Sequence, residues 1–321
     1  MQPFKHSDYK YFMQVIDNHS NNYYSDKKNS VISIGSFDGL HIAHNQIIEK
    51  VIEISNNKNY NSIIFTFEEP PKNYFAKQKT KILNLKKEKI SLIESKGIDY
   101  VYLQKFDLEF ANQTAEDFIS NILIKKLNLK TIIIGDDHRL GKDRSGDFEN
   151  LSKLGQKLDF EIIQIPSVYV DGIRVSSTNI RKSLEKGDIE TANKLLGYEY
   201  FLRGKVISGK QIGRKIGFPT ANLLVNDEKL LPNIGVYAVK AEVLGKMYPA
   251  MCNIGYRPSI NESNELTIEV HIINFSDYIY NQEIKLEFYA KIRNEMKFDG
   301  VDSLIEQLKL DKIYTSNYFS R

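Results

Sequence analysis

The sequence has little cysteine, little net charge and no long apolar run, and each shortage excludes a class of protein. A single cysteine, Cys252, cannot form an intramolecular disulfide or a cysteine-based metal cluster, which is typical of a reducing cytosol. The 44 Lys and Arg residues nearly balance the 41 Asp and Glu residues, so the net charge of +3 excludes a binder of nucleic acid through bulk charge. No run approaches the roughly 20 apolar residues that span a bilayer, and the N-terminus lacks a signal-peptide pattern. We therefore expect a cytoplasmic protein with no membrane and no nucleic-acid partner, which binds any anionic ligand locally.

The length of 321 residues predicts two domains, and the first half has the pattern of an α/β domain. Short β-branched runs alternate there with segments of helical spacing, which predicts a doubly wound parallel sheet covered on both faces. The expected strands are residues 31–35, 62–67, 100–103, 131–135 and 161–165, and the expected helices are residues 41–54, 85–95 and 115–127.

A different pattern begins after Gly197, where β-rich runs are separated by Gly, Pro and Asn. These runs, at residues 201–207, 235–245, 248–255, 266–275 and 283–292, predict a small antiparallel β-barrel. An amphipathic stretch at residues 301–310 predicts a helix packed on the barrel. We place the domain boundary within residues 184–199, which gives an N-terminal domain of residues 1–184 and a C-terminal domain of residues 185–321.

The most informative stretch of the first half joins a buried strand to a helix through a turn that contains Gly35 and Gly39. Glycine lets the backbone approach a ligand, and a helix N-terminus presents unpaired N–H groups, so a phosphate chain is the expected guest. His41 and His44 lie one helical turn apart, where two imidazoles can stabilise charge that develops on a phosphoryl group. Taken alone, such a pair is more often solvated or satisfied by hydrogen bonds.

With its flanking residues, this turn resembles the G-x-F-D-G-x-H-x-G-H pattern of the nucleotidylyltransferase superfamily. The form is that of the bacterial bifunctional riboflavin kinase/FAD synthetases. The resemblance implies that Gly35, Phe37, Asp38 and Gly39 bind ATP or its phosphates and that His41 and His44 act in catalysis. One position departs from the pattern, because Ala43 replaces the glycine between the histidines.

A second phosphate motif of that family, I-S-S-T-x-I-R, is matched by residues 175–181. By local chemistry its Ser/Thr cluster should cap a helix that begins near Asn179, with an arginine in the first turn. The resemblance implies that the cluster also binds ATP phosphates, through Ser176, Ser177, Thr178 and Arg181. Residues 135–147 resemble the flavin-side loop of the family, which makes Asp137 a flavin-binding candidate, although His138 and Leu140 replace two aromatic residues.

In the barrel half, glycines alternate with cations over residues 204–217, which suits a loop that wraps a polyphosphate. The segment continues into GRKIGFPTAN, which resembles the riboflavin kinase signature G-R-x-I-G-x-P-T-A-N. The resemblance implies that Gly209 and Arg214 bind ATP phosphates and that Thr220 and Asn222 hold Mg²⁺ with the nucleotide. Hard oxygen ligands are those that Mg²⁺ prefers.

The segment at residues 265–275 aligns with the part of that family that carries its catalytic carboxylate, which falls on Glu269. A carboxylate there can accept the proton of an attacking hydroxyl, whereas a glutamate in an alternating strand is ordinarily just solvated. Arg293 matches a flavin-side arginine, and its alternative role is a surface ion pair with Glu295 or a neighbour.

The resemblance thus implies an enzyme with two activities, which use ATP as co-substrate with Mg²⁺. The barrel would convert riboflavin and ATP to FMN and ADP, and the N-terminal domain would convert FMN and ATP to FAD and pyrophosphate. One alternative is a riboflavin kinase whose adenylyltransferase half is weak or lost, because of Ala43, His138 and Leu140. The other is a flavin-binding regulator without turnover. The oligomeric state stays open.

Overall fold

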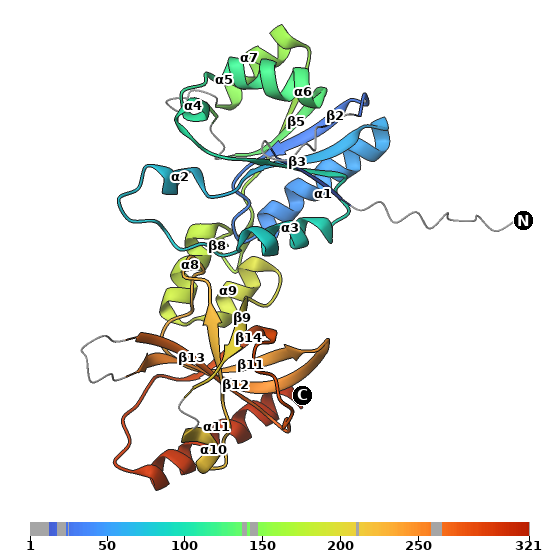
Figure 1. The fold of residues 1–321 in the computed structure, drawn as a ribbon. Helices are drawn as coiled ribbons and strands as arrows, with labels where there is room; N and C mark the ends of the chain where they lie inside the picture. Colours follow the sequence, from blue (N-terminus) through green and yellow to red (C-terminus); the bar gives the residue numbers. More distant parts are fainter. Residues whose placement is uncertain are drawn as a thin grey trace, which may run out of the picture. The chain divides into compact units, whose positions relative to one another are not determined.

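The structure is a computed structural model, and it describes residues 13–17, 24, 26–136, 140–141, 147–209, 212–257 and 265–320. The chain divides into two compact units (Figure 1). The first consists of Met1–Thr80 and Asn84–Tyr169, and the second of Lys81–Leu83 and Val170–Arg321. The short segment Lys81–Leu83 therefore belongs to the second unit, although the chain on both sides of it belongs to the first. The functional domain boundary after residue 184 stays a prediction.

The first unit is built on a six-stranded parallel sheet with strand order β1-β4-β3-β2-β5-β6, which confirms the expected fold class. The strands are β1 (Gln14–Asp17), β2 (Ser30–Ile34), β3 (Asn61–Phe67), β4 (Tyr100–Gln104), β5 (Leu129–Gly135) and β6 (Glu161–Ile165). Strand β1 was not expected, because four residues at a sheet edge carry too little apolar sequence to stand out.

Successive residues of each strand point to opposite faces of this sheet, and both faces are buried. Ile32, Phe65 and Ile132 pack on the side of α5 (Ala115–Phe118), η1 (Ile119–Ile124), α6 (Lys125–Leu127) and α7 (Phe148–Leu158). Val31 and Ile64 pack on the side of α1 (Ile42–Lys58) and α3 (Lys86–Glu94). The helix expected at residues 115–127 is present, with the π-helical segment η1 at its centre. Two short helices, α2 (Pro71–Tyr74) and α4 (Leu108–Ala111), complete the described part of this unit.

The second unit contains a closed antiparallel barrel with strand order β10-β13-β12-β11-β14-β9, which confirms the expected barrel. Its strands are β9 (Phe201–Ile207), β10 (Ala221–Val225), β11 (Gly235–Val243), β12 (Lys246–Arg257), β13 (Glu265–Ile272) and β14 (Glu283–Arg293). Strand β10 was not among the expected strands. It closes the barrel between β9 and β13 and begins inside the PTAN motif.

The helices of the second unit are α8 (Ser177–Lys186), α9 (Ile189–Leu196), α10 (Ile212–Lys215) and α11 (Val301–Phe319). The strands β7 (Tyr169–Val170) and β8 (Ile173–Arg174) form a separate two-stranded sheet. Helix α11 packs on the barrel as expected but continues well past residue 310. Its buried residues Asp311 and Thr315 are polar, so the amphipathic pattern did not reveal the second half of the helix.

Candidate active sites

The turn between β2 and α1 brings His41 and His44 together, as the sequence predicts. His41 is the N-cap of α1, and its Nδ1 accepts a hydrogen bond of 3.3 Å from the backbone N–H of His44. The two imidazole rings stack with their centroids 3.7 Å apart and nearly parallel. Because Nδ1 of His41 accepts, a neutral His41 carries its proton on Nε2 and can donate it to a ligand.

The pKa of His44 lies well below its ordinary value, first because the ring is desolvated and then because His41 and Lys89 lie nearby. The imidazole of His44 is therefore neutral near pH 7. Its Nδ1 is buried and makes no hydrogen bond within the described part of the chain. Such a ring acts as a hydrogen-bonding group toward a phosphate rather than as a cation.

The backbone of the turn is strained. Phe37 and Leu40 have φ of 47° and 36°, which few residues other than glycine adopt, and Gly39 has φ of 93°. Asp38 is buried, and its Oδ1 accepts a hydrogen bond of 3.2 Å from the N–H of Asn84. Strain of this kind is typical of functional turns, and it persists only where surrounding contacts hold the turn in place.

A cavity of about 310 Å³ adjoins this turn, and the sequence analysis missed it. Gly35 and Ser36 lie in its wall, at the carboxyl end of β2. The rest of the wall includes four phenylalanines from different parts of the chain: Phe67, Phe106, Phe110 and Phe118. The local sequence around each phenylalanine does not indicate a cavity, because these segments come together only in the folded parallel sheet. Leu140 also lines this cavity, whereas Asp137 and His138 lie outside the described residues.

The second phosphate motif caps a helix, with one correction. Ser176 is the N-cap of α8, and its side chain accepts a hydrogen bond of 3.2 Å from the N–H of Asn179. The helix begins at Ser177 rather than near Asn179, so Ser177 and Thr178 lie in its first turn instead of capping it. Arg181 is buried, and its Nε donates to the carbonyl of Lys81 at 3.2 Å. The ATP-binding roles of these residues stay predictions.

Two cavities of the barrel share Thr220. One, of about 350 Å³, is lined by residues that include Arg214, Tyr278, Tyr280, Val270 and Ile272. The other, of about 320 Å³, is lined by residues that include Phe218, Met251, Glu269, His271, Arg293 and Phe298. Alternate residues of β13 thus line different cavities, which places the two cavities on opposite sides of that strand. Thr220 is part of the wall of both cavities.

The predicted magnesium ligand Asn222 and the predicted base Glu269 are opposite each other on β10 and β13. Residues that pair in this way point to the same face of a sheet. A Cβ at Gly209 would lie 2.3 Å from Nδ2 of Asn222, so a side chain at position 209 would displace the Asn222 amide from its present position. The hydroxyl oxygen of Thr220 and the amide oxygen of Asn222 are hard ligands of the kind that Mg²⁺ prefers. Among the described residues, no group of three or more His, Cys, Asp and Glu side chains could hold a metal ion.

His271 was not recognised from the sequence, and it holds the turn that carries Thr220. Its Nδ1 lies 2.9 Å from the carbonyl oxygen of Pro219. Desolvation lowers the pKa of His271, so the ring is neutral and Nδ1 donates to that carbonyl. Its ring also packs against Phe218. The turn is therefore fixed from β13, the strand that carries Glu269.

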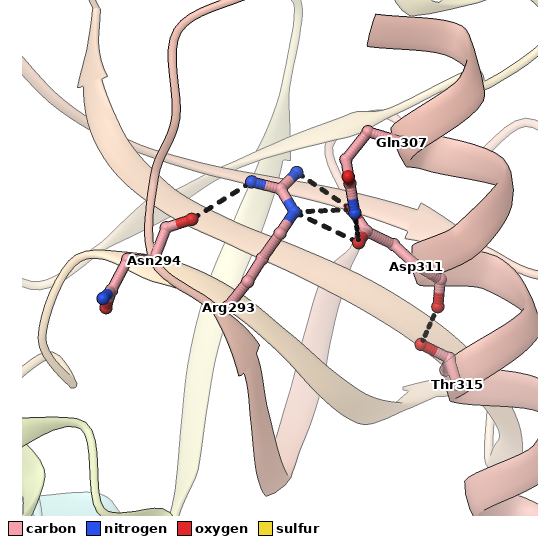
Figure 2. Close-up of polar contacts among 5 residues, drawn as sticks. All are labelled: Arg293, Asn294, Gln307, Asp311 and Thr315. Atoms are coloured by element: carbon pink, nitrogen blue, oxygen red, sulfur yellow. Dashed lines mark hydrogen bonds and ion pairs between the residues drawn. The ribbon is translucent and has the colours of Figure 1, made fainter. Parts of the chain in front are cut away.

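Arg293 is paired with Asp311 of α11 and not with Glu295 (Figure 2). Its Nε donates to both carboxylate oxygens, at 3.1 and 3.0 Å, and its Nη2 donates to Oδ2 at 2.9 Å. Asp311 is almost fully buried, at 1% exposed, and also accepts a hydrogen bond of 2.9 Å from Gln307. A charge-assisted pair of this geometry joins β14 to α11 at the wall of the 320 Å³ cavity.

These features define a class of protein. A parallel-sheet unit with a histidine pair at a strand end, and a barrel with two cavities around a Thr and a Glu, are the parts of an ATP-dependent transferase with two active sites. The profile of the FAD synthetase family matches residues 24–179, and that of the riboflavin kinase family matches residues 196–319. The chain belongs to the family of bifunctional riboflavin kinase/FMN adenylyltransferases.

The relatives cover nearly the whole chain. A bifunctional riboflavin kinase/FMN adenylyltransferase of Buchnera aphidicola subsp. Schizaphis graminum is 41% identical over 91% of this chain and 95% of that protein. Proteins of the same description from Bacillus subtilis and Escherichia coli are each 36% identical, over 91% and 90% of this chain and 93% and 92% of their own lengths. A crystal structure from Streptococcus pneumoniae, described as a macrolide-efflux protein, is 31% identical, with a TM-score of 0.87 over 94% of this chain and 99% of that one. In the part of this chain that the structure describes, no helix is long and apolar enough to cross a membrane.

Proposed function

We propose that this chain makes FAD in two steps, with the kinase step in the barrel and the adenylyltransferase step in the first unit. The observation that carries the proposal is the position of Thr220, which lines both a cavity that contains Arg214 and a largely apolar cavity that contains Glu269. A kinase needs one space for the nucleotide and one for the acceptor, with the transferred phosphoryl group between them. Family membership supports both activities rather than a kinase alone or a regulator without turnover.

In the kinase step, riboflavin occupies the cavity lined by Phe218, Met251 and Phe298, and ATP occupies the cavity lined by Arg214 and the tyrosines. Glu269 accepts the proton of the terminal ribityl hydroxyl as its oxygen attacks the γ-phosphorus. A new P–O bond forms, the bond to the β-phosphate oxygen breaks, and ADP leaves. Mg²⁺, held with the phosphates by Thr220 and Asn222, would neutralise phosphate charge. Gly209 and Arg214 contact the phosphates.

In the adenylyltransferase step, a phosphate oxygen of FMN attacks the α-phosphorus of ATP. The P–O bond to the β-phosphate breaks, and pyrophosphate leaves with its charge. His41 and His44 donate hydrogen bonds to the phosphoryl oxygens that gain charge in the transition state. Gly35, Phe37, Asp38 and Gly39 shape the turn that approaches the nucleotide. We also propose that Ser176, Ser177, Thr178 and Arg181 contact ATP phosphates, as the resemblance of their motif implies.

The aromatic cavity beside Gly35 takes the flavin ring of FMN in this second step. Its volume, its phenylalanine walls and its position next to the histidine turn suit a planar tricyclic ring whose phosphate must reach the turn. We also propose Asp137 as a flavin contact. In the barrel, we propose Arg293 as the corresponding flavin-side group. The single buried Cys252 suits an enzyme of the reducing cytoplasm.

Chromatography of products tests the proposal. The pure chain is incubated with riboflavin, ATP and Mg²⁺, and in parallel with Mg²⁺ removed by a chelator. We expect FMN followed by FAD, with both products lost on chelation. FMN without FAD would indicate a kinase with a lost adenylyltransferase half, and no product would indicate a flavin-binding regulator.

A further inference from the structure

Lys89, on α3 of the first unit, is a buried lysine that none of the recognised motifs includes. Its side chain is only 5% exposed. Its Nζ donates to the carbonyl of Phe67 at 2.6 Å, to the hydroxyl of Thr66 at 3.2 Å and to the carbonyl of Ser36 at 3.3 Å. An ammonium group has three N–H donors, so this arrangement uses all of them. A buried charge is costly, and a lysine at such a place needs an explanation.

The three acceptors belong to the ends of two neighbouring parallel strands. Thr66 and Phe67 end β3, and Ser36 follows the end of β2. The hydroxyl of Thr66 also donates to the carbonyl of Ser36, at 3.2 Å. Lys89 therefore joins the two strand ends where the strained turn begins, one residue before Phe37.

Ser36 and Phe67, whose carbonyls accept hydrogen bonds from Lys89, are also part of the wall of the aromatic cavity. On the other side of Ser36, the strained turn runs directly into His41 and α1. A small shift of the Ser36 carbonyl would move the cavity wall and the histidine pair relative to each other. Displacements of about 1 Å between reacting groups commonly cost about a hundredfold in rate.

We propose that Lys89 is a positioning residue for adenylyl transfer, which fixes the cavity wall and the histidine turn in one arrangement. The inference rests on the proposed adenylyltransferase function of the first unit. All three donors of Lys89 are used by the protein, so it acts through Ser36, Thr66 and Phe67 and not by touching a substrate. Asp38, a residue of the turn, lies close enough to interact with the positive charge of Lys89.

The test compares Lys89→Met, which keeps the length of the side chain without its donors, with Lys87→Met on the exposed side of the same helix. In the full chain, we expect kcat for FAD formation from supplied FMN to fall about ten- to a hundredfold in Lys89→Met, at saturating ATP and FMN and well below the Tm of the variant. Riboflavin phosphorylation should be unchanged in both variants, and Lys87→Met should make FAD at the wild-type rate. A role in folding alone would lower Tm and leave kcat of the folded enzyme unchanged, and that result would overturn the proposal.

A second variant keeps the proposal open to refutation if Lys89→Met does not fold. Thr66→Val removes one acceptor and the bridge to Ser36, and it should lower kcat for FAD formation several-fold. A wild-type rate in that variant would overturn the positioning role. If the wild-type chain itself made no FAD, the proposed function would fail. The positioning role of Lys89 would then be tested by FMN binding to the chain, measured by quenching of flavin fluorescence. We expect weaker FMN binding in Lys89→Met than in the wild type, and equal binding would contradict the proposal.

Discussion

Asn222 and Glu269 are direct register partners on two neighbouring antiparallel strands, β10 and β13, although Asn222 is the last residue of the PTAN motif and Glu269 lies in a separate segment. The pairing fixes the distance between their backbones to that of adjacent strands and turns both side chains to the same face. The predicted magnesium ligand and the predicted general base are thus both on strands rather than on loops. The kinase predictions below follow from this pairing.

Replacing Glu269 with glutamine removes the proton acceptor and keeps the size and polarity of the side chain. We expect Glu269→Gln to lower kcat for FMN formation by about a hundred- to ten-thousandfold, the range of general acid–base catalysis. Riboflavin and Mg-ATP should still bind, as measured by calorimetry. FAD formation from supplied FMN is the internal control and should be unchanged. Normal kinase turnover would return Glu269 to the role of a solvated strand carboxylate.

Replacing Thr220 should produce a different kinetic pattern from Glu269→Gln. Thr220→Ala deletes an oxygen ligand at the point that the two cavities share, so the Mg²⁺ concentration needed for half-maximal kinase activity should rise together with a loss of kcat. Thr220→Ser keeps the hydroxyl and is the matched control. The measurement is a Mg²⁺ titration of FMN formation at fixed ATP, and an unchanged requirement would remove the basis for the ligand assignment.

The sequence predicted most of the fold, because buried parallel strands and alternating barrel strands have strong local patterns. Strands β1 and β10 were missed, the first because it is short and at an edge, the second because its first residues were assigned to a ligand-binding turn. The far half of α11 was missed because its inner face carries Asp311 and Thr315, which satisfy their polar groups within the fold. Apolar periodicity cannot report a buried polar face.

For the sites, short contiguous motifs were recoverable and long-range arrangements were not. His41 and His44 are close in the sequence and lie together in the structure. The phenylalanine cavity, Lys89 and the partner of Arg293 all depend on contacts between segments far apart in the chain, which only the tertiary fold brings together. Local chemistry also placed the start of α8 two residues too late, because Ser176 alone provides the cap.

Loss of the His44 ring should affect only the first unit. We expect His44→Ala to lower FAD formation from supplied FMN by about a hundredfold or more, the scale of one lost transition-state donor. His41→Ala should have a weaker effect on the reaction and also cost about 1 kcal/mol of stability, since His41 caps α1. His41→Asn restores a good cap without an imidazole and separates the two losses. FMN formation from riboflavin is the control, and full FAD synthesis in His44→Ala would contradict the role.

Variants of the Arg293–Asp311 ion pair can distinguish a structural role of Arg293 from a role in flavin binding. Asp311→Asn leaves a partly buried guanidinium without its counter-charge and should lower the free energy of unfolding by about 3 kcal/mol, whereas Asp302→Asn at the exposed start of α11 should not. The double variant Arg293→Met, Asp311→Leu removes both charges and should recover most of that stability. If Arg293 contacts the flavin, the double variant will still have a raised KM for riboflavin. A normal KM for riboflavin would show that Arg293 has only the structural role of its ion pair with Asp311.

The stability and the adenylyltransferase activity should change in opposite directions with pH because of Lys89. Desolvation lowers the pKa of Lys89 to about 8, against about 10.4 in an unfolded chain, and the charged groups that face it are Asp38, Lys86 and Glu68. Between these two pH values the unfolded state binds the proton that the folded state has lost, so the stability conferred by this group rises with pH, by up to about 1.4 kcal/mol per pH unit.

Over the same interval the neutral amine has only two N–H donors for its three oxygen acceptors, so the turn at Ser36 loosens and FAD formation should fall. The measurement is the difference in unfolding free energy between wild type and Lys89→Met from pH 7 to 10, together with kcat for FAD formation over the same range. Subtracting the variant cancels the other groups that titrate. A flat difference in stability, or a decline in kcat that is the same in Lys89→Met, would show that this lysine does not titrate in the interval or does not act on the turn.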